Sequence, residues 1–142
     1  MFEIIRCEKT DFDTLAGIWE RSVRASHDFL TEDTISEIRE RLIPDYFPNV
    51  ALFAIRCNGR ISGFAGLAGD CIEMLFIDAD ARGTGLGSAL IDFAIRQGAT
   101  RVDVNEQNAA ALKFYLGKGF EITGRDATDE AGRPYPILHM SL

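Results

Sequence analysis

The chain of 142 residues is expected to form a single α/β domain built on a sheet of about seven strands with about four helices. The first observation is an apolar strand, a glycine-rich turn and an amphipathic helix in direct succession over residues 72–93. The second is Asn58-Gly59 between two apolar runs, a strong signal for a two-residue hairpin turn. The third is the length, which allows one domain to bury roughly 70% of its unfolded surface.

The remaining elements follow from periodicity and breaker residues along the chain. Strands are expected at residues 2–6, 51–57, 60–67, 71–78, 101–104, 120–124 and 136–140. Helices are expected at residues 10–23, 31–43, 86–94 and 108–118. Pro44 should stop the second helix and open a loop over residues 44–48, in which Tyr46 and Phe47 form either a small core or a substrate wall. No linker or repeat divides residues 1–142.

Composition excludes several classes of protein. Twenty-two acidic against fifteen basic residues give a net charge of −7, which argues against nucleic acid and suits either a cationic partner or simple solubility. Three cysteines, Cys7, Cys57 and Cys71, lack the number and spacing of a disulfide framework or a zinc site, so no metal is expected. With no visible export signal or membrane span, the expected compartment is the cytoplasm.

The glycine-rich turn predicts an anion-binding site. Glycines at 83, 85 and 87 remove side chains next to the first turn of a helix, whose N–H groups are unpaired. A dinucleotide fingerprint fits poorly because Ser88 stands where its third glycine belongs, and no lysine follows for an ATP or GTP loop. The spacing that fits is Arg82-x-x-Gly85-x-Gly87.

A second pattern lies downstream, where Asn108, Ala111, Phe114 and Tyr115 are followed by Gly119-Phe120. Together the two patterns resemble the signature of the GNAT superfamily of N-acetyltransferases, and the resemblance extends over nearly the whole chain, most of all to bacterial members. It implies an α/β (α+β) GNAT fold, with a central mixed, mostly antiparallel sheet that is splayed between strands four and five.

The resemblance also implies acetyl-CoA as co-substrate, with its pantetheine arm lying in the splay and its pyrophosphate on the glycine turn. The cofactor-binding residues implied are Leu75, Phe76, Ile77, Arg82, Gly83, Thr84, Gly85, Leu86, Gly87, Ser88, Asn108, Ala111 and Phe114. Asn108 also suits the N-cap of its helix.

Acetyl transfer to an amine requires a neutral amine, an oxyanion donor and a proton for the departing thiolate. Tyr115 is the expected proton donor; the alternative is that its ring only packs the helix on the sheet. Three candidates remain for the base: Glu73, expected on the same strand face as Leu75; His27, with a suitable intrinsic pKa; or water alone.

The expected function is direct transfer of an acetyl group from acetyl-CoA to a primary amine, which would enter between the His27 region and Tyr135. A non-catalytic acyl-CoA-binding sensor is the alternative, and a dinucleotide-dependent enzyme is a distant third. The residues do not distinguish a small amine from a peptide or protein amine, or a monomer from a homodimer.

Overall fold

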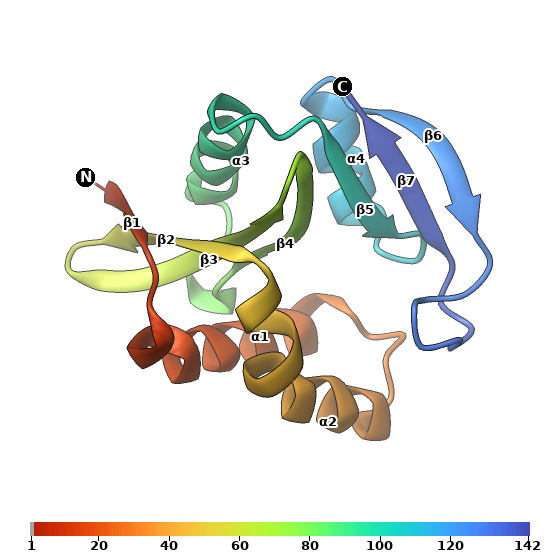
Figure 1. Cartoon of the computed structure of the whole chain (residues 1–142), viewed down its shortest axis with the longest axis horizontal. Helices are drawn as coiled ribbons and strands as arrows, with labels where there is room; N and C mark the ends of the chain where they lie inside the picture. The colour runs from red at the N-terminus through yellow and green to blue at the C-terminus, as the bar shows by residue number, and fades with distance from the viewer. Residues whose placement is uncertain (1) are drawn as a thin grey trace.

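The computed structural model describes residues 2–142, which form one seven-stranded sheet in the order β1-β2-β3-β4-β5-β7-β6 (Figure 1). The strands are β1 (Phe2–Arg6), β2 (Ala51–Cys57), β3 (Arg60–Ala68), β4 (Cys71–Ile77), β5 (Arg101–Asn105), β6 (Glu121–Asp126) and β7 (Ile137–Ser141). The α-helices are α1 (Phe12–Ser26), α2 (Glu32–Arg41), α3 (Leu86–Arg96) and α4 (Ala109–Gly117). The predicted fold class is confirmed. Among the described residues, no helix is long and apolar enough to cross a membrane.

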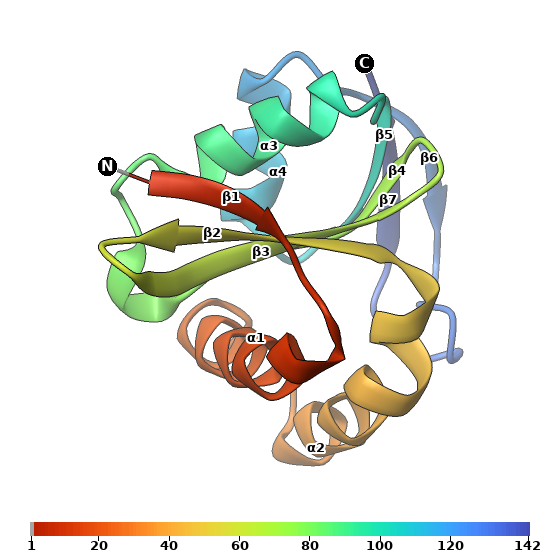
Figure 2. The same ribbon diagram turned by 60° about the vertical axis from the view of Figure 1, so that its left-hand side comes forward.

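The helices cover both faces of the sheet, with α1 and α2 on one side and α3 and α4 on the other (Figure 2). Helix α1 buries Leu15 and Ile18 completely, in a core shared with Phe64 of β3. Helix α3 buries Leu90 and Ile91 on the opposite face. Helices α1 and α3 each carry one apolar stripe, and burial of each large side chain in it contributes roughly 1.5–3 kcal/mol to stability.

The sheet opens between β4 and β5, its one parallel pair. These strands are paired only at Cys71 with Arg101 and at Ile72 with Val102. Beyond Ile72, β4 pairs with β3 alone, and Figure 1 shows β5 diverging from it. The register of β3 with β4 shifts at this point, because Leu67 faces Ile72 while Gly66 faces Met74. The extra residue, Glu73, is a β-bulge, which bends the strand and thereby helps to open the splay.

The bulge corrects one expectation about β4. Leu75 packs against the core on the α3 and α4 side, whereas Met74 and Phe76 pack against the core under α1. Glu73 lies beside Asp103, on the face of β5 opposite to buried Val102. Glu73 and Leu75 therefore do not share a face, because the inserted residue reverses the alternation of side chains.

The prediction that Pro44 ends the second helix in a loop is also wrong. Helix α2 ends earlier, at Arg41, and the chain continues as a π-helical turn, η2 (Leu42–Tyr46), and a 3-10 turn, η3 (Phe47–Asn49). Pro44 lies in the first turn of η2, where a missing N–H costs little. Phe47 is 1% exposed and Tyr46 packs on the same core, so Phe47 belongs to the core rather than to a substrate wall.

A buried carboxylate fixes α1 to the end of β4. Asp78 is 1% exposed and accepts hydrogen bonds from Arg21 of α1, from Nε at 3.0 Å and from Nη2 at 2.8 Å. The Arg21 guanidinium lowers the pKa of this carboxyl, so the pair is ionised at neutral pH. The contact holds α1 next to the strand end from which the glycine turn begins.

Candidate active site

A cavity of about 680 Å³ occupies the splay. Its walls come from β4 and β5, the C-terminal half of α1, the glycine turn and one side of α4. It brings together every site residue predicted from the sequence, namely His27, Glu73, Leu75, Phe76, Ile77, Arg82, Gly83, Thr84, Gly85, Leu86, Gly87, Ser88, Asn108, Ala111, Phe114 and Tyr115. These residues line one continuous cleft.

The glycine turn presents backbone to this cleft. Gly83 and Gly85 have φ of 73° and 84°, in the left-handed region that favours glycine. A Cβ added to Gly85 would meet no atom within 4 Å, so the space beside it is open. Gly85 is the N-cap of α3, and its carbonyl accepts the first intrahelical bond from Ala89. The N–H groups before Ala89 are therefore free of helical partners and can bind an anion.

Arg82 points away from the turn. Its Nη2 donates to the carbonyl oxygen of Ser22 at 3.0 Å and to the Ser22 hydroxyl at 3.3 Å, both on α1. These bonds tie the glycine turn to α1 and give the arginine of the motif a structural partner. The sequence did not predict Ser22 as the partner of Arg82.

The splayed part of β4 supplies a free strand edge. Leu75, Phe76 and Ile77 are half-buried, and their backbone pairs with β3 on one side only. An unpaired edge offers N–H and C=O groups at the spacing of an extended chain. The cleft thus has hydrogen-bonding groups for a ligand with amide groups along a thin chain.

Tyr115 faces this cleft from α4. It is 5% exposed, and its ring packs edge-on against Phe114 and Phe120. Burial raises the pKa of the phenol well above its ordinary value of 10, so the hydroxyl keeps its proton at neutral pH. A protonated hydroxyl at the cleft wall can donate to a ligand atom.

His27 is held between two helices. Its Nδ1 lies 2.7 Å from the Ser26 hydroxyl, and its Nε2 lies 3.2 Å from the side-chain amide nitrogen of Asn108. Asn108 is the N-cap of α4, since its Oδ1 accepts from the N–H of Ala111 at 3.2 Å. Burial and, to a smaller extent, the positive charge of Arg82 lower the His27 pKa to about 4. The imidazole is therefore neutral at physiological pH.

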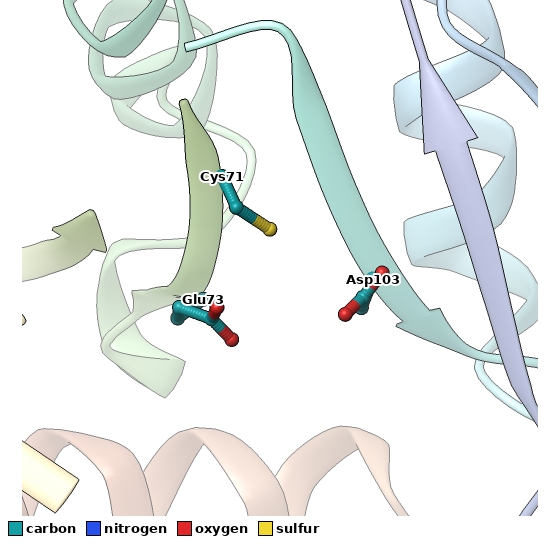
Figure 3. Close-up of side chains that lie close together, drawn as sticks. All are labelled: Cys71, Glu73 and Asp103. Carbon is teal, nitrogen blue, oxygen red and sulfur yellow. The ribbon is translucent and has the colours of Figure 1, made fainter. Parts of the chain in front are cut away.

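Glu73 projects into the gap between β4 and β5 together with Cys71, opposite Asp103 (Figure 3). One ligand atom from each of the three lies within 4.8 Å of the others. Burial, followed by the charge of Asp103, raises the Glu73 pKa above its ordinary value. Burial also raises the pKa of the Cys71 thiol to about 12, and a protonated thiol is a poor metal ligand, so we assign no metal to this group.

A second cavity, of about 710 Å³, adjoins the first on the α2 side and was not predicted. The two share Glu73, Asp103 and Asp129. Six carboxylates line the second cavity, from Asp45, Glu73, Asp103, Asp126, Asp129 and Glu130. His139 also lines it, between Asp103 and Asp126, and these two carboxylates raise the His139 pKa. Arg133, which also lines it, is paired with Asp129 at 3.2 Å and with Glu37 at 2.8 Å. This cavity therefore carries net negative charge and opens beside Glu73.

A mixed sheet splayed at its parallel pair, beside a glycine turn that opens a helix, is the fold of the GNAT acyltransferases. The model of the "Acetyltransferase (GNAT) domain" family matches residues 20–140, and the chain belongs to this family of N-acetyltransferases. It is 40% identical to the peptidyl-lysine N-acetyltransferase YjaB of Salmonella typhimurium LT2, over 99% of this chain and 97% of the relative. The Escherichia coli K12 protein of that name is 37% identical, over the same shares of both chains.

Solved structures agree with this assignment. The solution structure of apo-form YjaB from Escherichia coli matches with a TM-score of 0.90 at 36% identity, covering 99% of this chain and 97% of that one. The PaiA N-acetyltransferase of Thermoplasma acidophilum, solved in complex with coenzyme A, matches with a TM-score of 0.73 at 17% identity, covering 100% and 99%. At that identity the second likeness speaks for the fold alone.

Proposed function

We propose that this chain transfers the acetyl group of acetyl-CoA directly to the side-chain amine of a lysine in a peptide or protein. The observation that carries the proposal is that the free β4 edge, the glycine turn and Tyr115 line one cleft. The relatives named as peptidyl-lysine N-acetyltransferases support the choice of acceptor.

The residues of the cleft fit acetyl-CoA. The N–H groups at the start of α3 suit the pyrophosphate, and the open space at Gly85 lets its oxygens approach the backbone. The unpaired edge from Leu75 to Ile77 suits the two amides of the pantetheine arm. Apolar Ala111 and Phe114 line the wall between these parts. When bound, acetyl-CoA supplies the activated thioester.

In the proposed reaction the lysine nitrogen forms a bond to the acetyl carbon, and the bond from that carbon to sulfur breaks. The thiolate takes the proton of the Tyr115 hydroxyl, and the phenolate regains a proton from water. The amine loses one proton to become an amide. Burial keeps the Tyr115 hydroxyl protonated at the start of each turnover. Because the raised pKa makes transfer of this proton to the thiolate less favourable, the role requires the hydroxyl to be held close to the sulfur.

Glu73 is the proposed acceptor of the amine proton, directly or through water. It lies where the acidic cavity meets the cleft, and its raised pKa brings it nearer to the pH at which a base works best. His27 is less suited, because both of its ring nitrogens have partners and its pKa is depressed.

We place the acceptor lysine in the acidic cavity, where surrounding carboxylates attract a cationic segment. The other approach, beside Tyr135, is spanned by contacts: its hydroxyl lies 3.5 Å from Thr34 Oγ1, and its ring centroid lies 6.0 Å from that of Phe29. Entry of the primary amine between the His27 region and the last two strands, near Tyr135, stays a prediction.

The test is turnover on an N-terminally blocked peptide with one lysine, compared with the same peptide carrying arginine in its place. Release of CoA thiol with the lysine peptide alone, and one acetyl group located on that lysine by mass spectrometry, would support the proposal. Calorimetric binding of acetyl-CoA without thiol release from any amine would support the non-catalytic sensor instead.

A further inference from the structure

A chain of hydrogen bonds crosses the cleft from the glycine turn to the helix that carries Tyr115. It begins with Arg82, which donates to Ser22 of α1. The Ser26 hydroxyl donates to the carbonyl oxygen of Ser22 at 2.8 Å and lies 2.7 Å from His27 Nδ1. His27 Nε2 then meets the Asn108 amide, 3.2 Å away, at the N-cap of α4.

The chemistry of these partners fixes the tautomer of His27. Asn108 uses its oxygen to accept from the Ala111 N–H, so its amide nitrogen faces the ring and can only donate. Nε2 must therefore accept, and Nδ1 carries the hydrogen. The Ser26 hydroxyl has given its own hydrogen to Ser22, and so its oxygen can accept from Nδ1. Each hydrogen has one acceptor, and a second proton on the ring would break the bond to Asn108.

The contact between His27 and Asn108, which we call the bridge, lies at the start of the helix that carries Tyr115. Asn108 and Tyr115 are seven residues apart, about two turns, and so lie on one side of α4. Helix α4 is short, with nine residues, and its N-cap is the point at which α1 reaches it by a side-chain bond. Asn108 thus joins α1 to the N-terminal end of the helix that carries Tyr115.

We propose that His27 is a positioning residue, whose neutral imidazole joins α1 to the N-cap of α4 and keeps the glycine turn and Tyr115 in one geometry. This inference rests on the proposed function, since the geometry matters for the transfer of the proton from Tyr115. Displacement of a reacting group by about 1 Å can cost on the order of 10²-fold in rate.

Two substitutions separate a positioning residue from a base. Glutamine offers one acceptor and one donor on a side chain of similar reach but cannot take up a proton, whereas leucine offers neither. We expect His27→Gln to keep kcat for the lysine peptide within about threefold of the parent, and His27→Leu to lower it by about 10- to 100-fold. The Michaelis constant for the peptide should change little in both.

Equal inactivity of both variants, with unchanged circular dichroism and melting temperature, would overturn the proposal and restore His27 as the base. Parental activity in His27→Leu would overturn it as well, because the bridge would then be dispensable.

A readout independent of turnover is the tautomer itself. Long-range proton–nitrogen NMR spectra of the histidine-labelled protein at pH 7 should show His27 neutral with hydrogen on Nδ1. A charged ring, or hydrogen on Nε2, would overturn the bridge. If the parent released no thiol, the proposed function would fail, while the NMR result would still decide whether the bridge exists.

Discussion

Acid should destabilise this protein in part through His27, and the size of the effect follows from its surroundings. The His27 pKa falls from its ordinary value of 6.5 to about 4 in the folded state, chiefly by burial and then by Arg82, with Asp28 opposing. As pH falls, His27 is protonated at a higher pH in the unfolded chain than in the folded protein. The contribution of neutral His27 to the free energy of unfolding is therefore fully present above pH 6.5 and is lost as pH falls toward 4. The full loss is ~3 kcal/mol, of which ~2 kcal/mol is gone by pH 5.

Urea unfolding of the parent and of His27→Gln at pH 7 and pH 5 measures this effect. The parent should lose ~2 kcal/mol more than the variant over this range, because glutamine does not titrate. Carboxylates such as Asp78, whose pKa is lowered, act in both proteins and cancel in the comparison. Equal losses in the two proteins would refute the argument that His27 is buried in its neutral form.

His139 contributes to the free energy of unfolding with a pH dependence opposite to that of His27. Its ring nitrogens each lie 2.7 Å from a carboxylate, Asp103 on one side and Asp126 on the other, and these raise its pKa. Its contribution is therefore present below pH 6.5 and lost as pH rises through the raised pKa. Because the side chain is 38% exposed, solvent screening keeps this contribution small.

Four further outcomes are expected. Gly85→Asp should abolish measurable acetyl-CoA binding in calorimetry, since φ of 84° disfavours the new side chain and its charge repels pyrophosphate; unchanged affinity in a folded variant would exclude the loop. Tyr115→Phe should lower kcat on the order of 10²-fold with cofactor affinity kept, and turnover within about threefold of the parent would remove Tyr115 as proton donor. Glu73→Gln should lower kcat on the order of 10²-fold and remove one limb of the pH–rate profile; an unaltered profile would leave the proton to water. Gly63→Ala should cost ~1–3 kcal/mol of unfolding free energy in urea, because its Cβ would stand 2.9 Å from the Phe76 carbonyl oxygen, and a smaller loss would show that β4 shifts freely.

Sequence patterns predicted the elements around the cleft because each has a local cause. Asn58-Gly59 turns a hairpin with φ of 53° and 79°, and glycine at 85 opens α3 with its left-handed backbone. The recognised family signature then placed the splay between β4 and β5. These features depend on residues adjacent in the chain, and so they are visible without tertiary structure.

The bulge at Glu73 and the bonds from His27 to Asn108 could not be predicted in this way. A bulge depends on the register between two strands, which no single segment specifies. His27 and Asn108 are separated by 81 positions, and their contact exists only once α1 and α4 have docked. The acidic cavity is likewise assembled from α2, η2 and the turn between β6 and β7.

The short pairing of β4 with β5 also bears on solubility. A long unpaired strand edge usually invites a neighbouring molecule to add a strand, which leads to aggregation. Here the unpaired edge from Glu73 to Ile77 faces inward, across the gap from β5 and between α1 and α4, rather than along the rim of the sheet. A second folded molecule cannot reach it, but a single extended chain can. The fold thereby keeps an unpaired strand edge that can bind an extended ligand but cannot pair with a strand of another folded protein.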